Sequence, residues 1–135
     1  MATKEEIVAF FSAEFPQIKC GLVDVGNRSA TVSLDVESSH LRPGGTVAGP
    51  VIMTVADVAL YSAILGEIGI VPHIVTTSMT INFLRKPPAD KKLIGVCKLM
   101  KLGKTLAVGE VAVYSEGLMD PVAHIVGTYS IPPNR

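Results

Sequence analysis

The sequence predicts one α+β domain over residues 1–135, in which an antiparallel sheet of five to six strands wraps around one long helix. Strands, then a long apolar helix, then a run of strands follow one another without the β-α-β alternation of a parallel sheet. The composition is 48% hydrophobic and 18% charged, which supplies the apolar side chains for one core and excludes disorder.

The N-terminal part of the chain is predicted to form a short helix and a hairpin. Thr3 and Glu6 have the spacing of a capping box, so the helix should begin there and run to about Phe15. Two strands follow over Gly21–Val25 and Ser29–Glu37, joined by a tight turn. Apolar and polar side chains alternate in the second strand, which predicts that one of its faces is buried.

Prolines and glycines mark the remaining elements. A loop over residues 40–49 contains one proline and three glycines, which predicts irregular structure and close approach of its backbone to another group. The long helix should begin at Pro50 and end near Gly66 or Gly69. Four strands follow, separated by meander turns: Ile74–Leu84, Leu93–Lys101, Leu106–Ser115 and Val122–Ile131.

The apolar segment Pro50–Val71 is long enough to cross a bilayer, but it carries Asp57 and Glu67 and has no basic flank. A carboxylate at the bilayer centre costs about 2.5–3.5 kcal/mol on insertion scales. We therefore expect no membrane span and a helix enclosed by protein. A sheet of five or six strands buries such a helix best by wrapping around it, and that arrangement is the hotdog fold.

Charge and cysteine content restrict the partners and the compartment. Lys and Arg total 12 and Asp and Glu total 12, so no positive field exists to bind nucleic acid. Zero net charge with high apolarity indicates surface buried between subunits, and we expect an oligomer. Cys20 and Cys97 do not form a disulfide framework, and the N-terminus does not resemble a secretory signal, which predicts a cytoplasmic protein.

Asp57 is the most informative residue, because its neighbours are apolar or weakly polar. An ionised carboxylate there must be paired, hydrated or neutralised, and only Thr54 and Tyr61 offer hydrogen bonds from the same helix. One interpretation is an Asp that faces a wet groove or an interface without catalytic duty. The other is a general base or nucleophile at the edge of an apolar cleft.

Gly49 stands just before Pro50, where helix amides point outward and the helix dipole is positive. Its backbone N–H could bind a carbonyl oxygen that gains negative charge during acyl transfer. The alternative is a glycine that only shapes the turn into the helix.

The segment from Arg42 to Asp57 resembles the signature of the phenylacetate-degradation (PaaI-type) thioesterases, a hotdog family acting on acyl-coenzyme A. That signature is Asn-x-x-Gly-x-x-His-Gly-Gly, with an Asp eight residues after the first glycine of the pair. Gly45, Gly49 and Asp57 match it, and Asn82–Pro87 resembles the family strand that ends in Phe-Leu-Arg-Pro. Three positions depart from it: Arg42 replaces the Asn, Ala48 replaces the His, and Pro50 replaces the second glycine.

The resemblance implies an acyl-coenzyme A thioesterase that forms a homodimer or a dimer of dimers. In it the Gly49 N–H would polarise the thioester carbonyl, Asp57 would activate water or attack directly, and Thr76 would orient the nucleophile. Since the family's cleft lies between two subunits, Asp57 and Gly49 of one site would come from different chains.

Two further groups of residues are candidates for substrate contact. Four neutral polar residues are predicted to share one strand face, which suits an interface or a ligand groove: Thr76, Ser78, Thr80 and Asn82. Basic residues at turns form either a solvated rim or a clamp for the phosphates of coenzyme A. The predicted substrate contacts are Arg42, Gly45, Ala48, Tyr61, Asn82, Arg85, Lys86 and Lys104.

Other functions fit less of the sequence. A binding module that holds acyl-coenzyme A or a fatty acid without turnover is the main alternative, because the signature His and Asn are replaced. A hotdog dehydratase needs a His beside its acid, and no His is near Asp57 in the sequence. His40, His73 and His124 are scattered, so we expect neither a metal site nor a cofactor.

Overall fold

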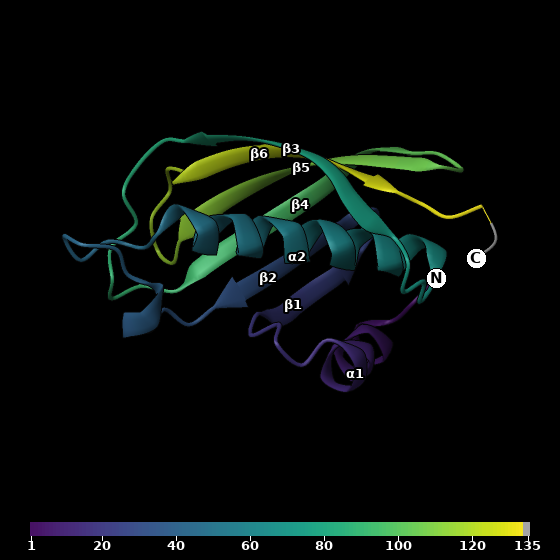
Figure 1. Cartoon of the computed structure of the whole chain (residues 1–135), viewed down its shortest axis with the longest axis horizontal. Helices are drawn as coiled ribbons and strands as arrows, with labels where there is room; N and C mark the ends of the chain where they lie inside the picture. The colour runs from purple at the N-terminus through teal and green to yellow at the C-terminus, as the bar shows by residue number, and fades with distance from the viewer. Residues whose placement is uncertain (134–135) are drawn as a thin grey trace.

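The computed structural model describes residues 1–133 and contains a six-stranded antiparallel sheet curved over a long helix (Figure 1). The predicted domain also included Asn134 and Arg135, which lie outside the described residues. The helices are α1 (Lys4–Glu14), the 3-10 helix η1 (Ser38–His40) and α2 (Gly49–Ile68). The strands are β1 (Gly21–Gly26), β2 (Ser29–Leu34), β3 (Val75–Phe83), β4 (Leu93–Leu102), β5 (Leu106–Ser115) and β6 (Ala123–Ser130).

The strand order is β1-β2-β4-β5-β6-β3, and every neighbouring pair is antiparallel. After α2 the chain forms β3 at one edge of the sheet beside β6, then crosses back to form β4 beside β2. Helix α2 lies along the concave face, and α1 lies beside β1 (Figure 1). The predicted α+β hotdog fold is confirmed, and the sheet has six strands.

Helix α2 fills the centre of the core, as predicted. It is long and apolar enough to pass for a membrane span, but 67% of that window is buried inside the protein. Leu60 is fully buried and packs against Gly109 and Gly127, where an added Cβ would lie 2.7 and 2.5 Å from its side chain. Glycines in β5 and β6 therefore let the helix approach the sheet closely.

The predicted boundaries lie within one residue of the observed ones, except at the end of β2, which falls three residues earlier. Helix α2 begins at Gly49, one residue before Pro50, with Ala48 as N-cap. Strand β2 ends at Leu34 rather than Glu37, because Leu34 pairs with Leu93, the first residue of β4. Residues beyond Leu34 have no partner in the ladder, and the chain turns into η1.

The prediction that Thr76 shares a strand face with Ser78, Thr80 and Asn82 is wrong. Thr76 pairs with buried Tyr129, whereas Ser78 pairs with Thr128 on the outer face, because the register shifts between the two pairs. The extra residue inverts the side-chain alternation, as β-bulges do. Thr76 consequently faces α2, and the other three residues lie on the outer face of the sheet.

Candidate active site

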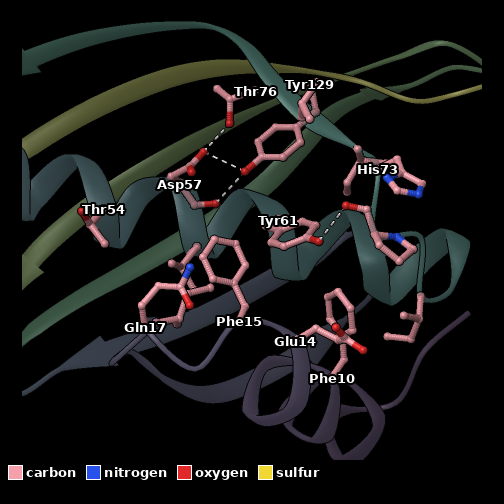
Figure 2. A pocket seen from close by; sticks show the side chains of 16 residues that line it. Phe10, Glu14, Phe15, Gln17, Thr54, Asp57, Tyr61, His73, Thr76 and Tyr129 are labelled. Atoms are coloured by element: carbon pink, nitrogen blue, oxygen red, sulfur yellow. Dashed lines mark hydrogen bonds between the residues drawn. The ribbon is translucent and has the colours of Figure 1, made fainter.

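Two hydroxyl groups hold the Asp57 carboxylate. Thr76 Oγ1 and Tyr129 Oη each donate a hydrogen bond of 2.7 Å to Asp57 Oδ1 (Figure 2). Tyr129 Oη also lies 3.2 Å from the Asp57 backbone carbonyl oxygen. No residue of the described range 1–133 donates a hydrogen bond to Asp57 Oδ2. One carboxylate oxygen is therefore occupied, and the other is left for a ligand or water.

The sheet register brings the two donors together. Thr76 and Tyr129 are directly opposed residues of β3 and β6, and both side chains point toward α2. Tyr129 is only 3% exposed, and its ring stacks on Tyr61 with centroids 5.9 Å apart. Burial, and next the charge of Asp57, raise the pKa of Tyr129 far above its ordinary value. Its phenol is therefore protonated at neutral pH and acts as a donor.

A cavity of about 960 Å³ opens beside Asp57, between α1, α2 and the start of β3. Phe10, Phe15 and Tyr61 line it with aromatic rings, and Phe15 meets Tyr61 edge-on at 6.4 Å. Polar side chains also line it: Glu14, Gln17 and His73. Its volume lies within the usual range for small-molecule sites, so it can hold an apolar group against the carboxylate.

A second, more open hollow of about 340 Å³ also reaches Asp57. Thr54, Asp57 and Thr76 line both spaces, and the hollow is completed by Pro50, Met53 and Met79. The carboxylate is therefore accessible from an aromatic cavity and from a hollow between α2 and β3.

The Gly49 amide is at the first turn of α2, and its N–H makes no hydrogen bond to another residue of the range 1–133. An added Cβ at Gly49 would lie 3.3 Å from the tip of the Phe83 ring. Gly49 and Asp57 are eight residues apart on one helix. At a rise of about 1.5 Å per residue they are separated by about 12 Å along its axis.

The hydrogen bonds that Thr54 and Tyr61 could offer Asp57 within the helix are not formed. Thr54 Oγ1 donates to the Pro50 carbonyl oxygen at 3.1 Å, and Tyr61 Oη donates to the Pro72 carbonyl oxygen at 3.5 Å. Tyr61 instead lines the aromatic cavity. The helical neighbours of Asp57 therefore shape its surroundings, while the sheet supplies its hydrogen bonds.

The loop residues Arg42, Gly45 and Ala48 lie just before α2. Gly45 closes a tight turn by donating its N–H to the Arg42 carbonyl oxygen at 3.0 Å, with a φ of 83° that favours glycine. Arg42 is exposed, and its side chain forms no ion pair or hydrogen bond with the rest of residues 1–133. This loop places an unpaired guanidinium a few residues before Gly49.

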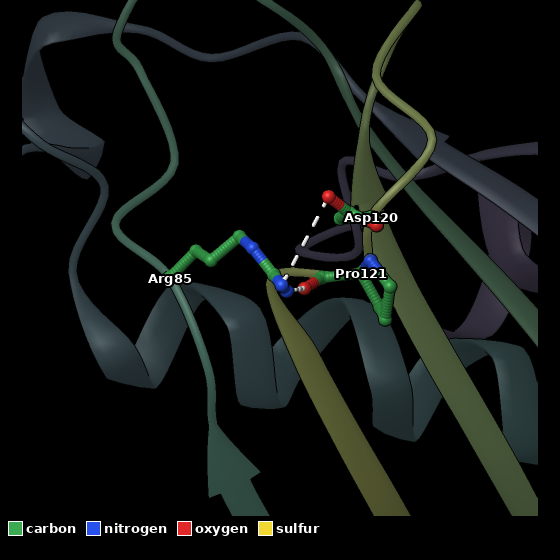
Figure 3. Close-up of polar contacts among 3 residues, drawn as sticks. All are labelled: Arg85, Asp120 and Pro121. Carbon is green, nitrogen blue, oxygen red and sulfur yellow. Dashed lines mark hydrogen bonds and ion pairs between the residues drawn. The ribbon is translucent and has the colours of Figure 1, made fainter.

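The remaining predicted contacts do not meet within one chain. Arg85 Nη1 donates to the Pro121 carbonyl oxygen at 2.6 Å, and its Nη2 lies 3.9 Å from Asp120 (Figure 3). Arg85 and Lys86 follow β3 at one end of the sheet, whereas Lys104 is in the β4–β5 turn at the other end. The eight residues of β6 separate these ends by about 25 Å. Asn82 is on the outer face, away from Asp57.

His40 and His124 make local contacts away from Asp57, and both cysteines are free thiols. Within residues 1–133 no three His, Cys, Asp or Glu side chains are grouped as a metal site would require. His40 Nδ1 accepts from the Glu37 N–H at 2.9 Å, and His124 Nε2 lies 3.1 Å from Glu110 Oε2. Cys20 and Cys97 are free thiols, and burial raises the pKa of Cys97 to about 12.

Sequence reasoning missed Tyr129. The alternation of Val122–Ile131 places Tyr129 on the inner face with Ile125, and a buried tyrosine hydroxyl needs a partner. Asp57 is the carboxylate in the middle of the helix that this face covers. Together these two observations would have predicted the hydrogen bond from Tyr129 to Asp57.

A sheet wrapped around one helix is the hotdog architecture, and here the helix carries a carboxylate at Asp57 and an unpaired amide at its start. Residues 44–122 match the family model of the Thioesterase superfamily, and the chain belongs to that superfamily. The superfamily assignment supports the hydrolysis of a thioester. A comparison with curated protein sequences gave no match.

Solved structures agree with this assignment. A protein of Silicibacter sp. TM1040, provisionally assigned as a thioesterase, is 41% identical over 97% of this chain and 92% of its own, with a TM-score of 0.90. Zebrafish thioesterase superfamily member 2 is 21% identical over 98% and 100% of the two chains, with a TM-score of 0.84. The Escherichia coli PaaI protein of the phenylacetic acid degradation operon is 18% identical over 95% and 91%, with a TM-score of 0.83. The last two similarities show the fold alone.

Proposed function

We propose that this protein is an acyl-coenzyme A thioesterase, which hydrolyses the thioester to a free acid and coenzyme A. The observation that carries the proposal is the Asp57 carboxylate, with Oδ1 held by two hydroxyls and Oδ2 left free between an aromatic cavity and an open hollow. The cavity suits an apolar acyl group. The thiol half of the substrate would extend into the hollow.

The distance between Gly49 and Asp57 supports a site shared by two copies of the chain. The carbon and oxygen of a carbonyl are about 1.2 Å apart, so the donor to the oxygen and the base for the attacking water must lie close together. One helix separates these groups by about 12 Å. We therefore infer that the amide comes from the second copy in a homodimer or a dimer of dimers.

The exposed edge of the sheet is the natural place for this second copy. Strand β3 pairs with β6 on one side only, and Val75 and Phe83 of β3 are more than half exposed. Met53 of α2, which lines the hollow next to this strand, is 41% exposed. A second copy would cover these apolar side chains and complete the hollow.

In the proposed reaction Asp57 Oδ2 removes a proton from water as the water oxygen bonds to the carbonyl carbon. Thr76 Oγ1, which gives its hydrogen to Asp57, can accept the second hydrogen of that water. The carbonyl oxygen becomes negative and accepts a hydrogen bond from the Gly49 N–H of the second copy. The C–S bond then breaks, and the thiolate takes the proton from Asp57.

The test is thiol release from a panel of acyl-coenzyme A esters by wild type and by Asp57→Asn. The Asn side chain keeps an amide oxygen that can accept hydrogen bonds from Thr76 and Tyr129. The amide cannot remove a proton from water. We expect turnover to fall by about 10²–10⁴-fold, the usual contribution of a general base. Asp35→Asn is the control, because Asp35 is exposed and lies 3.5 Å from Lys92, outside both spaces. Equal turnover in wild type and Asp57→Asn contradicts the proposal.

A protein that binds acyl-coenzyme A or a fatty acid without turnover is the second candidate. Ala48, where the family signature has His, is the observation that favours it. Tight binding of an ester by wild type without thiol release would support this candidate instead. The cytoplasmic location expected from the sequence stays a prediction.

A further inference from the structure

Tyr129 has the contacts of a residue that orients Asp57. Its hydroxyl reaches two atoms of the same residue, Oδ1 at 2.7 Å and the backbone oxygen at 3.2 Å. The Asp57 side chain and the helix backbone that carries it are thus fixed from one point on β6. Core packing already holds α2 against the sheet, and the Tyr129 hydroxyl adds a fixed donor at the level of Asp57.

The two donors to Oδ1 differ in how firmly they are held. Thr76 is exposed at the sheet edge, and its hydroxyl can rotate and exchange its bond for one to water. Tyr129 is buried, and its ring is fixed by stacking on Tyr61 at an interplanar angle of 17°. The phenol oxygen therefore has a single position, which is aimed at Asp57 (Figure 2).

We propose that Tyr129 is the positioning residue of the site: its hydroxyl holds Asp57 Oδ1, so that Oδ2 is the oxygen that reacts. This inference rests on the proposed thioesterase function. Tyr129 neither gives up nor takes a proton in the reaction. The raised pKa of its phenol is consistent with this role, because the group stays a donor across neutral pH.

Tyr129→Phe tests the proposal, because it removes the hydroxyl and keeps the ring that stacks on Tyr61. Thr76 still donates to Oδ1, so the carboxylate is not left without a partner. A carboxylate free to rotate presents Oδ2 correctly for a smaller part of the time. We expect kcat to fall about tenfold, the size of one hydrogen bond to a charged group, with KM within about twofold of wild type.

Tyr114→Phe is the matched control. Tyr114 is half-buried on the outer face of β5 and lines neither space at Asp57, so the loss of its hydroxyl should leave kcat and KM unchanged. The melting temperature of each variant reports the structural cost of the lost hydroxyl separately. A merely structural role for Tyr129 would lower the melting temperature without a selective loss of kcat.

A second substitution restores the donor. Incorporation of 4-aminophenylalanine at position 129 places an N–H donor at the former hydroxyl, and we expect it to recover most of the kcat lost in Tyr129→Phe. If the Phe variant fails to fold, the aminophenylalanine protein is compared with wild type instead. A folded aminophenylalanine protein with a kcat about tenfold below wild type then overturns the proposal. A folded aminophenylalanine protein that keeps the low kcat of the Phe variant overturns the proposal.

The outcomes separate the positioning role from the proposed function. If Asp57→Asn abolishes thiol release while Tyr129→Phe equals Tyr114→Phe, the positioning role is wrong and the thioesterase proposal stands. If Asp57→Asn keeps wild-type turnover, the carboxylate is not the catalytic group and both proposals are wrong.

Discussion

Arg42 is an unpaired cation in the loop that leads to Gly49, at a position where the family signature has a neutral Asn. A guanidinium there can bind a carboxylate of the acyl group in bidentate fashion. We predict that Arg42→Ala lowers kcat/KM about tenfold for dicarboxylic acyl esters and leaves neutral acyl esters within about twofold. Steady-state kinetics on a matched pair of esters measures this ratio, and the melting temperature should not change.

Two other results would define a different role for Arg42. An equal loss with every ester contradicts binding of an acyl carboxylate and indicates contact with the part of the substrate that all esters share. No loss with any ester indicates that the guanidinium contacts solvent alone.

The site could be predicted only in part, because its residues come from distant parts of the chain. Asp57 was identified because a carboxylate in an apolar helix needs partners. Its observed partners are 19 and 72 residues away, on strands whose pairing decides which side chains face the helix. The same-helix neighbours Thr54 and Tyr61 were the local candidates, yet their hydroxyls donate to backbone oxygens instead.

At the scale of elements, the free energy of unfolding depends on the close contact between α2 and β6. A Cβ at Gly127 would lie 2.5 Å from Leu60 Cδ1, and Leu60 is fully buried. We predict that Gly127→Ala lowers the free energy of unfolding by about 1–3 kcal/mol, the usual cost of overpacking a core. Denaturant unfolding at equilibrium measures the change.

Gly21→Ala is the control for this prediction. Gly21 is in the edge strand β1, where an added Cβ would lie 3.4 Å from Ser33 Oγ, an ordinary contact. We expect its effect to be within about 0.5 kcal/mol, as is usual at surface positions. Equal effects of the two substitutions would mean that α2 is not held closely against β6.

Local signals predicted the elements well, and long-range pairing explains what they missed. The capping box of Thr3 and Glu6 begins α1 as predicted, and β5 has the predicted bounds. The bulge that turns Thr76 toward α2 depends on the register between β3 and β6, which no local pattern contains. The end of β2 depends in the same way on where β4 begins.

At the scale of the whole molecule, one chain contains both groups that the proposed reaction needs but holds them apart. The Gly49 amide and the Asp57 carboxylate are separated by about 12 Å along α2. The open edge of β3 and the hollow beside it are the surfaces on which a second copy can bring the missing group. We therefore infer that each active site takes its amide from one chain and its carboxylate from another.

Mixing two inactive variants tests directly whether the amide and the carboxylate of one site come from different chains. Asp57→Asn removes the base, and Gly49→Pro removes the amide hydrogen at a helix start where Ala48 is already extended, as a residue before proline prefers. Gly49→Ala, assayed alone, reports the cost of an added Cβ that keeps the N–H. Each of the two inactive variants should be impaired by itself.

Random exchange of subunits makes half of the dimers hybrid, and each hybrid contains one site with both functional groups. With a shared site, thiol release in the exchanged mixture should rise to about a quarter of the wild-type rate. If each site uses the amide and the carboxylate of the same chain, no site in the hybrid is intact. If the subunits exchange and the rate of thiol release stays at the average of the two variants, the amide and the carboxylate do not come from different chains.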